Sequence, residues 1–122
     1  MKDATFMLDG HEIRVIHGPY LVDAVPTSAA KQFAKTLIDL LDDMRACAAN
    51  SHLRIYNDSW RDENEPIIDV PEFCARLTNP SIVLYDELGS ALTYFNDSDM
   101  FLGHFIQVSV HDGKIANASM VG

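Results

Sequence analysis

One amphipathic pattern in the first half of the chain constrains the fold most strongly. Apolar residues recur at every third or fourth position from Ala30 to Ala48, and charged residues such as Lys35 occupy the opposite side. This pattern predicts an α-helix with one face buried against another layer. Thr27 or Ser28, just before it, can cap the free amides of its first turn. The rest of the chain must supply the surface that covers this helix.

Short apolar runs predict strands on both sides of the helix. Residues 4–8 and 13–16 flank Asp9-Gly10, a pair that favours a tight hairpin turn, and Pro19 then ends this pattern. Near the end of the chain Ile106, Val108 and Val110 alternate with polar residues, as in a sheet with one side covered. The predicted strands of this second half form a β-meander and are residues 82–85, 91–95, 105–110 and 115–121, the last two joined by Asp112-Gly113.

A second, shorter helix is predicted between these regions. Asp69 stands at a cap position, followed by Pro71 and Glu72, and the helix runs through Leu77 with Phe73 and Leu77 facing inward. Asn79-Pro80 is expected to stop it. Residues 53–56 extend the long helix or form a short strand, and residues 57–66 are polar enough to be a loop.

The predicted fold class is α+β, with a mainly antiparallel sheet packed on one long amphipathic helix and a short second helix. The sheet combines the N-terminal hairpin with the C-terminal meander. A length of 122 residues suits one domain, 1–122. No apolar run is long enough to span a membrane and no export signal opens the chain, so a cytoplasmic location is expected. The two cysteines, Cys47 and Cys74, are too few for a disulfide scaffold.

The negative charge is concentrated in one segment. Ten of the eighteen acidic residues lie between Tyr56 and Asp99, against two arginines, while the net charge of the whole chain is −9. Such a charge repels phosphates, so nucleic-acid binding is disfavoured. It attracts a basic protein partner instead.

The same segment contains a candidate partner-binding surface around the only tryptophan, Trp60. Tryptophan and tyrosine are frequent interface anchors, and charged side chains mainly set the rate of association. The alternative is that Trp60 packs in the core and the acids only solvate a loop. The candidate partner-binding residues are Tyr56, Asp58, Trp60, Asp62, Glu63 and Glu65.

A second candidate cluster is Asp97, Asp99 and His104. Two carboxylates and an imidazole could hold a divalent metal ion, although their spacing fits no standard ligand frame. The alternative is a turn in which the aspartates bond to their own backbone and His104 packs against the helix. No serine, cysteine or histidine lies in a recognised nucleophile frame, so no catalytic residue and no cofactor are predicted.

Several single residues and short motifs form a pattern along the second half of the chain. They are Tyr56-Asn57-Asp58-Ser59-Trp60, Phe73, residues 97–106 from Asp97-Ser98-Asp99-Met100 onward, Asp112-Gly113-Lys114-Ile115 and residues 118–122. This pattern resembles a bacterial family catalogued as a domain of unknown function. The resemblance covers roughly residues 33–122, and Leu102 stands where members usually have an aromatic residue. In size and charge the chain also resembles the immunity proteins of polymorphic or contact-dependent toxin systems.

These observations predict a non-enzymatic protein-binding protein. Its specific form would be an acidic immunity protein that neutralises a cognate toxin, with a nuclease as the expected partner because nuclease clefts are basic. One alternative is a small metal-dependent enzyme or metal-binding domain that uses Asp97, Asp99 and His104. Another is a structural or regulatory module of a larger assembly.

Overall fold

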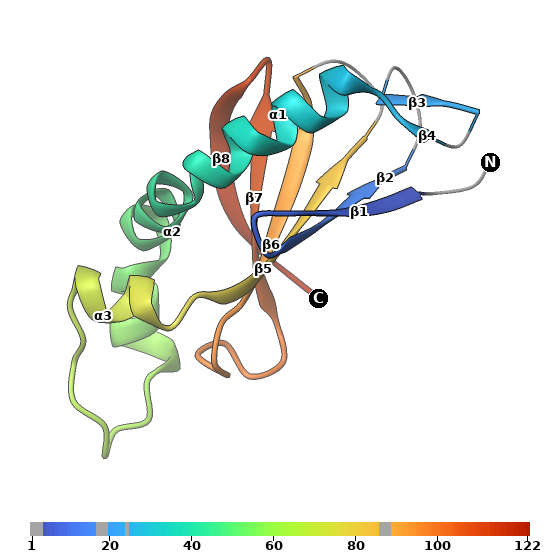
Figure 1. Ribbon diagram of the computed structural model, residues 1–122. Helices are drawn as coiled ribbons and strands as arrows, with labels where there is room; N and C mark the ends of the chain where they lie inside the picture. Colours follow the sequence, from blue (N-terminus) through green and yellow to red (C-terminus); the bar gives the residue numbers. More distant parts are fainter. Residues whose placement is uncertain (1–3, 17–19, 24, 86–88) are drawn as a thin grey trace.

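The computed structural model describes residues 4–16, 20–23, 25–85 and 89–122 (Figure 1). Pro19, predicted to end the first hairpin pattern, lies outside these ranges, as do Asp86 and Glu87, two of the ten acids of the acidic segment. The described part is a six-stranded sheet with helices on one face. This arrangement confirms the predicted α+β class.

The sheet has the strand order β1-β2-β5-β6-β7-β8, and a small second sheet pairs β3 with β4. All neighbours in the large sheet are antiparallel except β2 and β5, which run parallel and join the N-terminal hairpin to the meander. No pattern in the sequence predicts this parallel pairing. The strands are β1 (Ala4–Leu8), β2 (His11–Val15), β3 (Leu21–Val22), β4 (Val25–Pro26), β5 (Thr78–Leu84), β6 (Ala91–Asn96), β7 (Phe105–His111) and β8 (Lys114–Val121).

Two tight turns set the register of the outer hairpins. Asp9 and Gly10 have φ of 49° and 78°, and Asp112 and Gly113 have φ of 55° and 74°. A two-residue hairpin turn with positive φ at both positions matches the twist of the strands that it joins, and aspartate and glycine tolerate it best. Both predicted hairpins are therefore confirmed.

The predicted long helix is divided in two. Helix α1 (Ser28–Asp39) contacts β1, β2 and β5, whereas α2 (Leu41–Ile55) contacts β7, β8 and α3 (Val70–Ala75). At Leu40 the backbone N–H bonds both to Thr36 and to Leu37, at 3.1 and 3.0 Å, which tightens the last turn of α1. The break lets each helix follow its own part of the twisted sheet.

The helical segment also continues further than predicted. A π-helical turn, η2 (Tyr56–Trp60), extends α2, so residues 57–60 are helical and only the following part of the predicted polar loop is irregular. Strand β5 begins earlier than the predicted range of residues 82–85. Asn79 and Pro80, which were expected only to follow the short helix as a stop, lie inside the strand, at a shift of register between Thr78 and Ser81 that accommodates the proline.

The core lies between the helices and the sheet. On β7 the side chains of Ile106, Val108 and Val110 are fully buried, while Gln107 and Ser109 lie half-buried on the opposite face. The predicted alternation is therefore confirmed. Phe73 on α3 and Leu77 just beyond it are buried as expected, although the helix ends at Ala75 and not at Leu77. Among the described residues no helix combines the length and the apolarity needed to cross a membrane.

The start of α1 provides a test of local stabilisation. The Thr27 hydroxyl accepts a hydrogen bond from the Ala30 amide at 3.1 Å, which identifies Thr27 as the cap. We expect Thr27→Ala to lower the free energy of unfolding by about 1 kcal/mol, since one helix amide loses its partner. Ser28→Ala is the matched control and should change it far less. Urea unfolding of both variants gives the comparison, and equal losses would contradict the assignment.

Candidate functional site

Phe101 is the centre of an aromatic cluster that joins the helices to the loop of residues 97–104. Its ring is fully buried and four aromatic rings meet it nearly edge to face. Edge-to-face pairs at such separations are favourable beyond the area that they bury. The centroid distances from Phe101 are 6.2 Å to His52, 5.8 Å to Tyr56, 5.5 Å to Trp60 and 6.4 Å to Phe73.

Two of the predicted aromatic anchors belong to this cluster in different ways. Trp60 is half-buried, and its ring contacts Phe101 on one side and His104 on another, where the ring centroids are 5.7 Å apart. Tyr56 is only 3% exposed, and its hydroxyl accepts a hydrogen bond from Arg76 at 3.2 Å. Its assignment to a partner-binding surface is therefore corrected, because the ring packs in the core and is not exposed.

The four predicted acidic residues, in contrast, are all exposed. Asp58 lies on η2, and its carboxylate is 3.6 Å from the Arg54 guanidinium. This ion pair is exposed and contributes little to the stability of the fold. Asp62 accepts a hydrogen bond from the Asn64 amide at 3.1 Å, a local turn contact. Glu63 and Glu65 follow in the same stretch. We call residues 58–65 the acidic loop.

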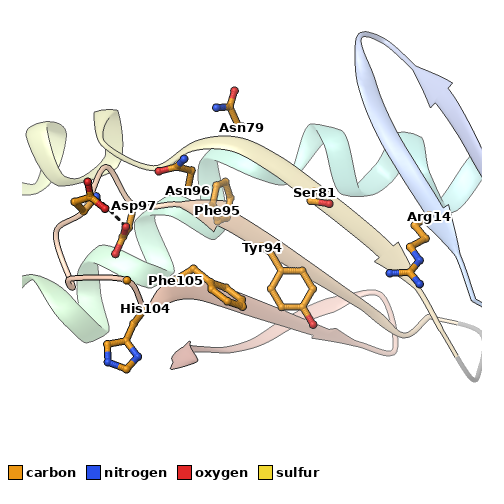
Figure 2. Close-up of a pocket in the computed structure, with 11 residues that line it drawn as sticks. Arg14, Asn79, Ser81, Tyr94, Phe95, Asn96, Asp97, His104 and Phe105 are labelled. Atoms are coloured by element: carbon orange, nitrogen blue, oxygen red, sulfur yellow. Dashed lines mark hydrogen bonds between the residues drawn. The ribbon is translucent and has the colours of Figure 1, made fainter. Parts of the chain in front are cut away.

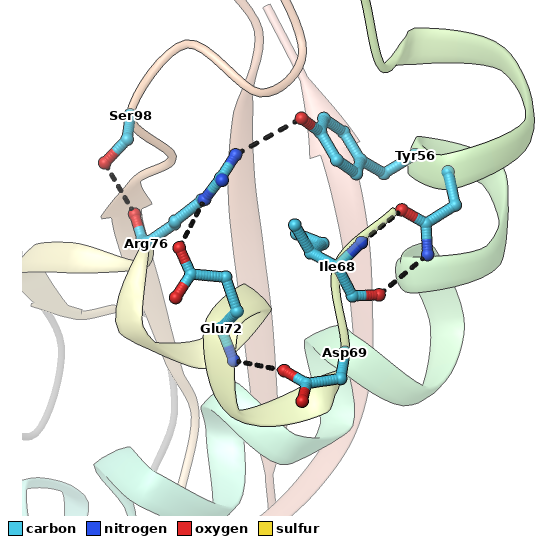
Figure 3. A network of polar contacts seen from close by, with 7 residues as sticks. Tyr56, Ile68, Asp69, Glu72, Arg76 and Ser98 are labelled. Carbon is cyan, nitrogen blue, oxygen red and sulfur yellow. Dashed lines mark hydrogen bonds and ion pairs between the residues drawn. The ribbon is translucent and has the colours of Figure 1, made fainter. Parts of the chain in front are cut away.

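The acidic loop is held in place by side chains that bond to its backbone. The Arg61 guanidinium donates to the carbonyls of Asn57 at 3.3 Å, of Asp62 at 3.2 Å and of Glu65. The Asn57 amide pairs with both backbone groups of Ile68, at 2.9 and 3.1 Å, and closes the base of the loop (Figure 3). The loop conformation is fixed while its carboxylates remain in water.

A further polar network connects this region to the loop of residues 97–104. Arg76 donates to Tyr56 and to Glu72, both at 3.2 Å, and its carbonyl accepts from the Ser98 hydroxyl at 2.9 Å (Figure 3). Asp69 accepts from the Glu72 amide at 3.0 Å and caps α3, as the sequence predicts. The two loops are thus parts of one connected structure.

The predicted metal cluster has a structural role in this arrangement. Asp97 is 4% exposed, and its two carboxylate oxygens accept from the amides of Asp99 and Phe101 at 3.0 and 3.1 Å. Asp99 is exposed, and the His104 ring packs on Trp60. Across the described ranges no three histidine, cysteine or carboxylate side chains converge as metal ligands. The geometry matches the turn alternative and gives the metal hypothesis no support.

The sequence did not predict a groove on the open face of the sheet. This shallow groove of about 630 Å³ crosses the face that the helices do not cover, between Arg14 and His104 (Figure 2). The rings of Tyr94 and Phe105 meet on its floor, 5.4 Å apart. The alternation along β6 and β7 was the available signal, because it placed Tyr94 and Phe105 on the opposite face from the buried residues.

Asp97 provides a test of how the loop of residues 97–104 is held. We expect Asp97→Asn to lower the free energy of unfolding by about 1–3 kcal/mol, because an amide can accept through only one of its two polar atoms and leaves a buried N–H unpaired. Asp99→Asn makes the same charge change on an exposed side chain and should have little effect. Thermal or urea unfolding measures both. Equal stability of the two variants would contradict the structural role.

His52 predicts a pH dependence of stability. Burial against Phe101 lowers the pKa of His52 below its ordinary value of 6.5, so the unfolded chain takes up this proton first. The contribution of the neutral His52 ring to the free energy of unfolding is therefore complete above pH 6.5, and it is lost as the pH falls toward the pKa of His52 in the folded protein. Unfolding measured between neutral and mildly acidic pH should show a smaller loss for His52→Asn than for the unmodified protein. An identical dependence of the free energy of unfolding on pH in the two proteins would refute this prediction.

Comparison with known proteins identifies the family. The family model described as "Uncharacterized protein conserved in bacteria (DUF2262)" matches residues 9–120. No curated protein and no solved structure matches the chain. The matched span includes the aromatic cluster and both loops described above, and it confirms the resemblance to a bacterial family of unknown function. It begins at residue 9, well before the predicted start near residue 33, and so includes β2 of the first hairpin. The chain belongs to the DUF2262 family.

Proposed function

We propose that this protein is a non-enzymatic binding protein that docks its acidic loop on a basic surface of another protein. The observation that carries this proposal is the combination of a fixed backbone with outward carboxylates. Arg61 donates to carbonyls of the loop backbone and Asn57 closes the base of the loop at Ile68, while Asp58, Asp62 and Glu63 remain exposed. A surface that is ordered before binding loses little conformational freedom in the complex.

The local charge balance supports a basic partner. Arg54 and Arg61 are the only cations within residues 54–65, and the exposed pair between Arg54 and Asp58 is readily exchanged for a partner's cation. Acids gathered on one surface accelerate encounter with a basic protein and make the association sensitive to salt. The chain has a net charge of −9, so the whole protein attracts a basic partner at long range, as the acidic loop does at short range.

The specific form of the proposal is an immunity protein that acts in the cytoplasm and neutralises a toxin. A nuclease is the expected partner, because its substrate cleft must attract phosphates and carboxylates can take their place. An interface of about 1,600 Å² is within reach of a domain of this size. Size, charge and the fixed acidic loop support this form.

The test replaces the four acids of the loop by amides. The variant Asp58→Asn, Asp62→Asn, Glu63→Gln, Glu65→Gln should lose a basic protein that co-purifies with the tagged protein from its own lysate at low salt. Its control, Glu12→Gln, Asp39→Asn, Asp43→Asn, Asp112→Asn, makes the net charge less negative by the same four units on other exposed residues. With a purified partner, we expect a slower association rate and a weaker salt dependence only for the loop variant.

Two results would overturn the proposal. One is the absence of any stoichiometric partner at low salt. The other is equal binding by the loop variant and its control, which would remove the role of the loop. The immunity form has a separate readout: the captured partner should show nuclease activity that the unmodified protein suppresses at equimolar concentration. A partner without such activity would leave the binding function and refute the immunity form.

A further inference from the structure

The groove on the open face of the sheet has opposite charges at its two ends. Arg14 of β2 lies at one end, and Asp97 and His104 lie at the other (Figure 2). The Asp97 carboxylate accepts from the amides of Asp99 and Phe101, so its oxygens are engaged within the loop. Asp99 also lines the groove, and its side chain is exposed, as is that of Arg14. The groove therefore offers a cation at one end and an accessible carboxylate at the other.

The register of the strands gives the separation of these charges. Arg14 is paired with Val83 on β5, and Val83 is paired with Leu92 on β6. From Leu92 the strand continues to Asn96, and the loop that contains Asp99 follows. The four residues after Leu92 cover about 14 Å of extended strand. The two charges are therefore separated by about the length of an extended tetrapeptide.

The middle of the groove is apolar. The rings of Tyr94 and Phe105 form its floor with their centroids 5.4 Å apart, and Phe105 is 37% exposed. An apolar side chain that packs on these rings removes its own surface and theirs from water. An apolar floor with a few polar groups at defined positions is typical of ligand sites, where the apolar contact gives affinity and the polar groups fix the orientation.

Neutral polar side chains accompany the apolar floor. Asn79, Ser81 and Asn96 line the groove and are exposed. Side-chain amides and hydroxyls both donate and accept hydrogen bonds, which matches the N–H and C=O groups of an extended peptide. A guanidinium has five N–H donors, so Arg14 can bind a carboxylate while it keeps a contact within the protein. These groups suit a peptide with a free carboxyl terminus.

We propose that this groove is a binding site for a peptide of about four residues with both termini free. The peptide carboxylate pairs with Arg14, its terminal ammonium pairs with Asp99, and an apolar side chain packs on Tyr94 and Phe105. Such a peptide is neutral as a whole, so the net charge of −9 does not repel it as it repels a phosphate-bearing ligand. A neutral sugar would leave both charges without a counterpart. This site goes beyond the proposed function, because it does not use the acidic loop.

The probe is the tetrapeptide alanine-phenylalanine-leucine-alanine, titrated into the full-length protein at pH 7, where both peptide termini are charged. Shifts of backbone amide NMR signals give the site and the affinity. We expect the peptide to shift signals of β6, β7 and residues 97–104. A C-terminal amide or an N-terminal acetyl group should each weaken binding about fivefold, because an exposed ion pair is lost. Serines in place of phenylalanine and leucine should weaken it about tenfold.

Variants of the protein assign each charge to one end of the peptide. Arg14→Gln should bind the free and the amidated peptide equally, and Asp99→Asn should bind the free and the acetylated peptide equally. The matched controls, Lys114→Gln and Asp112→Asn, make the same charge changes on exposed residues that do not line the groove. Each control should keep both fivefold differences. Thermal unfolding should differ little among these variants, because all four side chains are exposed.

Three results would overturn this inference. No shift of groove signals at millimolar peptide would refute the site. Equal affinity of the free and blocked peptides, or loss of the differences in the controls, would refute the assignment of the two ends. Binding of a neutral tetrasaccharide at the same signals, with no response to the peptide, would assign the groove to sugars instead. Each of these results leaves the proposed function standing, since that function is tested with a basic protein.

Discussion

The burial of Phe101 is the contact on which the rest of this end of the molecule depends. One ring from a loop fills the space between α2, η2 and α3, and rings from all three helices meet its edge or face. Since the loop of residues 97–104 contributes this ring, the loop and the helices stabilise one another. Trp60 extends the cluster to the surface, where it contacts His104. The position of the acidic loop follows from the same packing.

The polar side chains around this cluster act mainly on backbone groups. Asp97 accepts from two amides, Asn57 pairs with both groups of Ile68, and Arg61 donates to three carbonyls. Groups engaged in this way fix the conformation of the loops. The carboxylates of the acidic loop and the side chain of Leu102 are exposed to solvent. The proposed function rests on this combination of an ordered backbone and exposed charges.

Sequence reasoning succeeded where an interaction spans only a few residues. The Asp-Gly turns, the Asp69 cap and the alternation along β7 all follow from local geometry, and each is confirmed. It failed where distant segments decide. Tyr56 looked like an anchor because it stands among acids, yet it is buried, since Phe101 and Arg76 come from elsewhere in the chain to meet it. The exposure of the four acids of the loop was predicted from composition, but their fixed backbone was not.

The sequence by itself determined the fold class, both tight hairpin turns and the segment that carries the negative charge, because turn chemistry, periodicity and charge can be read from neighbouring residues. Only the tertiary structure decided the parallel pairing of β2 with β5, the break at Leu40 and the left-handed conformation of Leu102. Each of these depends on contacts between segments far apart in the chain. Local preference at such positions is weaker than the free energy gained by burying the core, and so the packing prevails.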